Sequence, residues 1–172
     1  KFLGSDFLVV VDAFSKWLEV IPMSQPTTTA TIRALTDLFA RYGLCETIVS
    51  DNGSQFTSHE FVSFCDRNGI KRLTTPPGHP QSNGQAERYV DTVKTALNKA
   101  LYRGGSMSDA LMTFLFHYRS TPHATTQQAP ADLFLKRSLR TLLDLLRPDT
   151  LVPAESAQQR SQRHFDRRAK QR

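Results

Sequence analysis

Residues 47–56 have the sequence Thr47-Ile48-Val49-Ser50-Asp51-Asn52-Gly53-Ser54-Gln55-Phe56, an apolar run that leads into an acid and a turn. A second block, Gly78-His79-Pro80-Gln81-Ser82-Asn83-Gly84-Gln85-Ala86-Glu87-Arg88, opens a long helical pattern. Thirty-five residues separate Asp51 from Glu87. An acid after a strand and an acid in the first turns of a helix can converge when the chain between them folds back. Because converging carboxylates stay ionised mainly when a cation lies between them, the two blocks predict a divalent-metal site for phosphoryl transfer.

The rest of the chain alternates short apolar runs with helical periodicity. Strands are expected at residues 7–11, 17–21, 46–50 and 70–74, and helices from 27–29 to about 42, from 57 to 69, 81 to 101, 108 to 119, 130 to 135 and 139 to 146. Gly43 is expected to end the first helix in a left-handed conformation, and the capping box Thr57-Ser58-His59-Glu60 to open the second. The segment 75–84, rich in proline and glycine, is expected to be a loop with hinges at Gly78 and Gly84. This order of elements is typical of an α/β fold.

Four stretches of the chain together resemble one known family. The Asp51 and Glu87 blocks, in this order and at this spacing, are similar to the last two acids of the integrase catalytic core of retroviruses and long-terminal-repeat retrotransposons. Val9-Val10-Val11-Asp12-Ala13-Phe14-Ser15-Lys16-Trp17 and Tyr118-Arg119-Ser120-Thr121-Pro122-His123 are similar to the Gypsy-type branch of that family. The resemblance covers about residues 3–148. It implies a ribonuclease-H-like mixed sheet flanked by helices.

The family's site has three acids, and the first lies on a central strand that precedes the strand expected at 7–11. The chain begins at Lys1, about where that strand should have ended, so we expect the first acid and its strand to be absent. Asp6 lies at the foot of the strand at 7–11. Asp12 follows its far end, where we expect it to cap a turn rather than to bind metal. Loss of the strand removes backbone partners from its neighbours, so this fragment is expected to be less stable and catalytically weak or inactive.

The resemblance implies metal-assisted attack on DNA phosphodiesters, in which water trims the element's ends and the freed 3′-hydroxyl then attacks the target strand. Asp51 and Glu87 would bind Mg²⁺ or Mn²⁺, with two ions in the intact family site. The alternative for Asp51 is a turn closed by its own side chain and Gly53. The alternative for Glu87 is an acid in the first turns, where the helix dipole favours it.

DNA contacts are expected around Glu87. Lys94 lies two helical turns beyond Glu87 on the same face and would meet a DNA phosphate; its alternatives are a solvated side chain or an ion pair with Asp91. The further candidates are Arg88, Asn83, Gln85 and His79, of which the histidine is as well explained by backbone or water contacts. Tyr118, Arg119 and His123 are interpreted as core packing with polar tips. The leucines of 139–146 are interpreted as packing, with a partner site as the alternative.

The basic character of the chain is concentrated in its last residues. The net charge is +6, and residues 156–172 hold six Lys or Arg and one Asp, or +5, which leaves +1 for residues 1–155. We therefore expect a truncated catalytic core at 1–148 and a basic linker or tail at 149–172 toward a missing C-terminal domain. Cys45 and Cys65 are interpreted as reduced core thiols, with a bridge as the alternative. No apolar run of 18 residues exists and no leader opens the chain, so neither a membrane span nor secretion is expected.

DNA integration is the leading functional hypothesis: a retroelement integrase core that works on DNA in the nucleus as a homo-oligomer. The alternative is a decayed or domesticated copy that binds DNA or a partner without catalysis. Another nuclease of the same fold is disfavoured by the two quoted acid blocks. An acid encoded upstream of Lys1 would favour the first hypothesis, and a natural start at that position the second.

Overall fold

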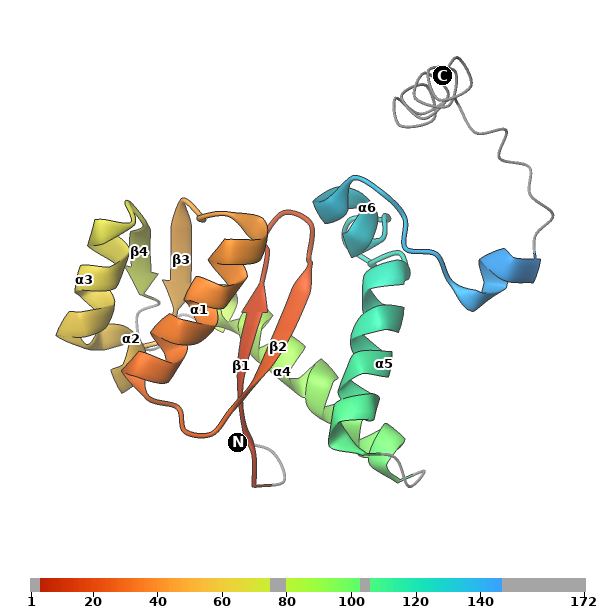
Figure 1. Ribbon diagram of the computed structural model, residues 1–172, viewed down its shortest axis with the longest axis horizontal. Helices are drawn as coiled ribbons and strands as arrows, with labels where there is room; N and C mark the ends of the chain where they lie inside the picture. The colour runs from red at the N-terminus through yellow and green to blue at the C-terminus, as the bar shows by residue number, and fades with distance from the viewer. Residues whose placement is uncertain (1–3, 75–79, 103–105, 147–172) are drawn as a thin grey trace, which may run out of the picture. The chain divides into compact units, whose positions relative to one another are not determined.

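A computed structural model describes residues 4–74, 80–102 and 106–146, with the backbone alone for residues 80–87 and 100. The chain divides into two compact units, residues 1–139 and 140–172. Figure 1 shows the elements of the first unit. In order they are β1 (Asp6–Val11), β2 (Leu18–Met23), α1 (Thr28–Tyr42), β3 (Thr47–Ser50), α2 (Ser54–Thr57), α3 (His59–Arg67), β4 (Lys71–Thr74), α4 (Pro80–Leu101), α5 (Met107–Ser120) and α6 (Pro130–Leu135). The second unit contains the 3₁₀ helix η1 (Leu142–Leu146).

The first two strands form an antiparallel hairpin with a tightly bonded turn. β1 pairs with β2 from Asp6 opposite Met23 to Val11 opposite Leu18. One carboxylate oxygen of Asp12 accepts hydrogen bonds from the Ser15 N–H at 2.7 Å and the Ser15 hydroxyl at 2.6 Å. The expected turn-capping role of Asp12 is therefore confirmed.

The second pair of strands is parallel, with two helices in the connection. β3 pairs with β4 from Thr47 opposite Lys71 to Ser50 opposite Thr74. α2 and α3 lie between these strands in the chain, as a parallel connection requires. α2, a single helical turn after Asp51, was not expected from the sequence.

Helices cover both faces of the strands. One core cluster joins Leu35 and Leu38 of α1 to Phe61 and Phe64 of α3, and Val10, Ile21 and Ile48 from three strands pack against it. The other cluster joins Leu18 and Val20 of β2 to buried residues of α4 and α5, namely Tyr89, Val93, Leu97, Ala110 and Leu111. The expected α/β class is therefore confirmed.

The strands form two separate two-stranded sheets instead of one continuous sheet. Among the described residues, β1 pairs only with β2 and β3 only with β4. Both pairs nevertheless contribute to the same helix-packed cluster, through Val10 and Ile48. Val49 of β3 is 56% exposed although valine favours buried strands. This is the arrangement expected of a mixed sheet that lacks a central strand.

Several local expectations are corrected. The loop expected at 75–84 is wrong from Pro80 onward, because α4 begins there. A proline is tolerated in the first turn of a helix, where its missing N–H has no partner in any case. Gly84 lies inside this 22-residue helix, so its assignment as a hinge is wrong; Gly78 lies outside the described residues. Gly43 has a positive φ of 85° as expected, but its ψ of 172° is extended and not left-handed helical.

The leucines of residues 142–146 lie in η1. Thr141 and Asp144 close the first turn of η1, where the Asp144 carboxylate accepts hydrogen bonds from the Thr141 N–H and hydroxyl. Leu142, Leu143, Leu145 and Leu146 are between 58% and 80% exposed. Because η1 belongs to the second unit, the interpretation of these leucines as packing residues stays a prediction. The predicted domain boundary at residue 148 stays a prediction.

Both cysteines are free thiols, as expected. Cys65 is buried in the α1–α3 cluster and Cys45 packs against it, half-buried. Burial raises the pKa of both thiols. No helix in the described part of the chain combines the length and the apolarity that a membrane crossing requires.

Candidate functional site

Asp51 directly follows strand β3 and sits in a turn closed by its own side chain. Its Oδ1 accepts a hydrogen bond from the Gly53 N–H at 3.0 Å, and the residue is exposed. Gly53 precedes α2, and a Cβ at this position would lie 2.6 Å from Gln55 Nε2 and 3.0 Å from Asp51 Oδ1. A side chain at residue 53 would therefore displace Gln55 and crowd the carboxylate. The turn with Gly53, the alternative considered for Asp51, is present, and it orients the carboxylate at the strand end.

Glu87 lies in α4, seven positions after the helix begins at Pro80. Its backbone is helical, as predicted, but its side chain lies outside the described residues, as do those of Asn83 and Gln85. His79 lies outside the described residues altogether. Whether the Asp51 and Glu87 carboxylates meet therefore stays a prediction.

The position of Glu87 on α4 follows from the residues of this helix that are buried. Tyr89, Val93 and Leu97 form the buried face of α4. Glu87 precedes Tyr89 by two positions, or about 200° around the helix, which places it on the opposite side from Tyr89. Sequence reasoning missed Tyr89; its spacing from Val93 and Leu97 was the signal that could have identified it.

Arg88 and Lys94 are the two DNA-contact candidates whose side chains are described. Arg88 is exposed and Lys94 is half-buried. Lys94 lies about 10 Å along the helix from Glu87 and within about 20° of its direction. Lys94 forms no ion pair with Asp91, because the single ion pair of the described residues joins Arg119 and Glu19. The structure thus leaves the Lys94 ammonium group available on the face expected for Glu87.

Asp12 lies at the other end of the strand layer from Asp51. β1 and β3 point in opposite directions (Figure 1), and Asp12 follows β1 whereas Asp51 follows β3. Asp6 opens β1, opposite Met23 of β2. No cluster of three or more His, Cys, Asp or Glu residues suited to a metal ion occurs in the described parts of the chain. A third carboxylate for Asp51 is therefore not supplied by Asp12.

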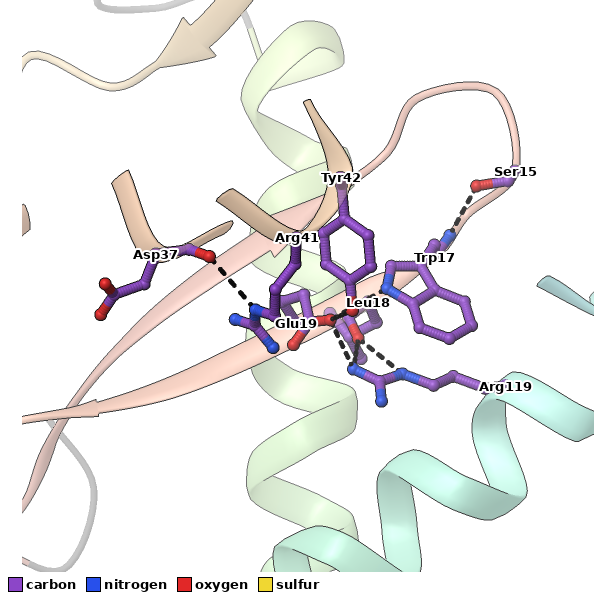
Figure 2. A network of polar contacts seen from close by, with 8 residues as sticks. All are labelled: Ser15, Trp17, Leu18, Glu19, Asp37, Arg41, Tyr42 and Arg119. Atoms are coloured by element: carbon purple, nitrogen blue, oxygen red, sulfur yellow. Dashed lines mark hydrogen bonds and ion pairs between the residues drawn. The ribbon is translucent and has the colours of Figure 1, made fainter. Parts of the chain in front are cut away.

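The motif residues around Arg119 form a buried polar network (Figure 2). Glu19 Oε1 accepts hydrogen bonds from Trp17 Nε1 at 3.0 Å and from the Tyr42 hydroxyl at 2.8 Å, and forms an ion pair with Arg119 Nη2 at 3.0 Å. Arg119 also donates from Nε and Nη2 to the Leu18 carbonyl, at 3.1 and 2.7 Å. Its guanidinium carbon lies 4.2 Å from the Trp17 ring centroid. Arg119 is therefore a core residue that joins α5 to β2, as interpreted.

A second polar cluster joins α4, α5 and the following loop. The Tyr89 hydroxyl lies 3.5 Å from His123 Nε2, and His123 Nδ1 accepts a hydrogen bond from the Thr125 N–H at 3.1 Å. The Tyr118 hydroxyl donates to the Lys16 carbonyl at 3.0 Å. Burial, with a smaller contribution from the Lys16 charge, lowers the pKa of His123. Burial and the hydrogen bond with Tyr89 raise the pKa of Tyr118. The packing interpretation of Tyr118 and His123 is therefore confirmed.

The chain has one antiparallel and one parallel strand pair, with helices on both faces and an acid after the parallel strand β3. This combination is that of a ribonuclease-H-like protein. A crystal structure of the catalytic core domain of BIV integrase has this fold and superposes on the chain with a TM-score of 0.64 and 26% sequence identity. The match covers 78% of this chain and 88% of that chain. Residues 4–80 match the family described as Integrase core domain. The matched segment, residues 4–80, thus belongs to the integrase core family, and the structural match supports an integrase catalytic core.

Curated relatives agree with this assignment. The uncharacterized protein K02A2.6 of Caenorhabditis elegans is 41% identical over 150 residues, which is 87% of this chain and 12% of that protein. The Gag-Pol polyprotein of Walleye dermal sarcoma virus is 31% identical over 155 residues, 84% of this chain and 9% of the polyprotein. The Pro-Pol polyprotein of Simian foamy virus type 3 is 36% identical over 94 residues, 55% of this chain and 8% of the polyprotein. The chain thus spans a small part of the length of these relatives.

Proposed function

We propose that the chain is the catalytic part of a retroelement integrase, which trims DNA 3′ ends and transfers them to a target strand. The observation that carries this proposal is Asp51. It directly follows the parallel strand β3, lies within the segment matched to the integrase core family, and is oriented by the Gly53 N–H. Glu87 of α4 would supply the second carboxylate.

The donor groups at this position suit a divalent cation. Asp51 presents a carboxylate whose Oδ1 accepts a hydrogen bond from the Gly53 N–H. Hard cations such as Mg²⁺ and Mn²⁺ prefer oxygen ligands, so Asp51 and Glu87 would hold them. A bound ion would supply charge stabilisation for displacement at phosphorus. The residues of the chain orient the carboxylate and, through Lys94, bind a DNA phosphate.

The two retained acids limit what these 172 residues do alone. Asp12 is engaged with Ser15 in the hairpin turn, which supports a role in the turn and not as the third carboxylate. We therefore propose that the 172-residue chain turns over DNA slowly or not at all without a further acid. The proposed substrates are retroelement DNA ends and target DNA, handled by a homo-oligomer in the nucleus.

A strand-transfer assay on a labelled DNA end, in Mg²⁺ or Mn²⁺, tests the proposal. The assay compares the 172-residue chain with a chain extended upstream in the same reading frame. In the extended chain, Asp51→Asn and Glu87→Gln are expected to reduce joined product to background. The matched control is Asp37→Asn, at an exposed acid of α1, which is expected to leave product formation unchanged.

Two outcomes would contradict the proposal. Full activity of Asp51→Asn or Glu87→Gln in an active extended chain would remove these residues from the reaction. Equal turnover by the 172-residue chain and the extended chain would show that the two acids suffice.

A further inference from the structure

The turn between β1 and β2 presents an aromatic ring to solvent. Phe14 is 70% exposed. The turn that carries it is held by the bonds from Ser15 to Asp12, by the Asp12 N–H donating to the Trp17 carbonyl at 2.9 Å, and by the Lys16 N–H donating to the Asp12 carbonyl at 3.0 Å. Ser15 itself is buried. An exposed ring on a rigid turn retains little conformational freedom to lose when a ligand stacks on it.

One basic side chain lies beside this ring, and two more are adjacent in the sequence. Lys136, which ends α6, places its Nζ 5.9 Å from the Phe14 ring centroid, and the adjacent Arg137 is exposed. Lys16 follows Phe14 by two residues, and its Nζ donates to the Ala13 carbonyl at 2.6 Å. We call Phe14, Lys16, Lys136 and Arg137 the hairpin-tip patch.

Two lysines of the hairpin-tip patch have unusual backbone conformations. Lys16 has a φ of 63° and Lys136 a φ of 57°, and among the described non-glycine residues only Gln127 shares a positive φ. Side chains with a Cβ adopt this region at an energetic cost, and retained strain of this kind concentrates at binding sites. One of these lysines lies two residues after Phe14, and the other places its Nζ beside the Phe14 ring.

The acidic groups near the hairpin-tip patch do not cancel its charge. Asp12 carries the negative charge of the turn, and its carboxylate is engaged by Ser15. Asp132, in the first turn of α6, has its Oδ1 buried from solvent. Two exposed cationic side chains, Lys136 and Arg137, and the half-buried Lys16 therefore stand against one engaged carboxylate in the turn.

We propose that the hairpin-tip patch binds single-stranded nucleic acid, with a base stacked on Phe14 and phosphates contacted by Lys16, Lys136 and Arg137. An exposed aromatic ring among basic groups is the combination that binds unpaired strands, because every base has a face that can stack. A duplex covers its base faces and would use only the charges. The patch lies at the opposite end of the strand layer from Asp51 (Figure 1), so this contact is separate from the proposed reaction site and does not depend on its carboxylates.

The test measures binding of fluorescein-labelled dT20, and of a duplex of equal length, by fluorescence anisotropy across a salt series. Phe14→Leu, which keeps an apolar group without a stacking face, is expected to weaken dT20 binding about tenfold and duplex binding less than about twofold. Phe14→Trp is expected to retain dT20 binding. The paired substitution Lys136→Gln with Arg137→Gln is expected to reduce the slope of log affinity against log salt by about 1.4, or about 0.7 for each phosphate contact on a single strand.

Matched controls come from other exposed positions. Met112→Ala removes an exposed apolar side chain of α5, and Arg33→Gln with Arg67→Gln removes two exposed charges from α1 and α3. Both are expected to leave dT20 affinity within about twofold, and the basic residues near the C-terminus contribute equally to all variants.

Three results would overturn the proposal. The first is unchanged dT20 affinity in Phe14→Leu with unchanged unfolding. The second is an equal loss for dT20 and duplex. The third is a change in self-association, seen by sedimentation, in place of a change in dT20 affinity, which would assign the patch to contact between copies of the chain.

Discussion

At the scale of single residues, Glu19 shows how a charge is kept inside this fold. One of its oxygens meets three donors, from Trp17, Tyr42 and Arg119. The Arg119 and Glu19 side chains are 18% and 11% exposed. A buried charge is tolerated only when it is paired and hydrogen-bonded, so removal of one partner leaves the other uncompensated. Burial and the bond to Glu19 also raise the pKa of Tyr42.

Arg119→Met is expected to lower the free energy of unfolding by about 3 kcal/mol, because Glu19 would stay buried without its cation. Urea denaturation measures this loss. Arg41→Met is the control, because Arg41 is also beside an aromatic ring, 5.3 Å from the Tyr42 centroid, but is exposed. We expect it to cost less than about 1 kcal/mol. Equal losses in the two variants would show that burial of the Glu19–Arg119 pair adds nothing to the free energy of unfolding.

His123 gives a pH dependence at the same scale. Burial lowers its pKa, so folding favours the neutral imidazole. The resulting stabilisation is complete above the ordinary histidine pKa of about 6.5 and is lost as the pH falls through the lower pKa of the folded state. The free energy of unfolding of the wild type should therefore fall in acid, and a variant without this imidazole should not show that fall.

His123→Asn keeps an acceptor for the Thr125 N–H but does not titrate. The variant should have a lower free energy of unfolding than the wild type at pH 7.5, and this difference is expected to become smaller as the pH is lowered to 5. Urea unfolding at each pH measures the difference. His117→Asn, at an exposed histidine of α5, should show no such narrowing. A deficit for His123→Asn that is constant with pH would exclude His123 as the titrating group.

At the scale of elements, α3 shows how a cap is chosen between two neighbouring hydroxyl residues. The sequence pattern predicted a capping box from Thr57 to Glu60. In the structure Ser58 is the N-cap, and its Oγ accepts a hydrogen bond from the Phe61 N–H at 3.2 Å. Thr57 instead ends α2, and its hydroxyl donates to the Gly53 carbonyl at 3.4 Å. The unexpected single turn of α2 thus moves the cap by one residue.

Ser58→Ala is expected to destabilise the fold by about 1 kcal/mol, because the Phe61 N–H loses its acceptor. Thr57→Ala should cost less than about half as much, because its hydrogen bond is long and exposed. Thermal and urea unfolding of both variants check the order. A larger loss for Thr57→Ala than for Ser58→Ala would indicate that Thr57 is the N-cap of α3, as the sequence pattern predicted.

At the scale of the whole molecule, the strands are divided into two pairs. Val10 of β1 and Ile48 of β3 pack against the same helices, yet neither strand pairs with the other. Unpaired strand edges are sites of association between chains. Within the described ranges β3 pairs with β4 alone, and it carries the exposed Val49, whereas the neighbouring Ile48 is half-buried against α1 and α3.

Val49→Lys is expected to change the free energy of unfolding by less than about 0.5 kcal/mol and to reduce aggregation, because a lysine on an open strand discourages pairing between chains. Ile48→Lys should cost about 2 kcal/mol or more, because it places a charge against an apolar cluster. Urea unfolding and light scattering measure both. A large loss in Val49→Lys would mean that the space beside β3 is occupied.

Elements defined by local signals agree with the sequence prediction. The hairpin strands begin and end within two residues of expectation, Thr27 caps α1, and α6 spans Pro130–Leu135 as predicted. Apolar periodicity, caps and prolines act over a few residues, so these elements follow from the sequence itself. α4 begins at Pro80, one residue before the helix start expected at 81, although the prolines and glycines of 75–84 also indicated a loop there. Packing of Tyr89, Val93 and Leu97 stabilises a helix whose first turns have poor propensity.

The amino-acid sequence alone determined the α/β class, most elements, and the two acid blocks that resemble an integrase core. Only the tertiary structure decided that Asp12 closes a turn at the far end from Asp51, that Arg119 pairs with a glutamate 100 positions away, and that the strands separate into two pairs. The physical reason is the distance along the chain over which the interactions act. Propensity and periodicity depend on neighbours within a few positions, whereas the burial of a charge and the pairing of a strand edge depend on which distant groups exclude water from them.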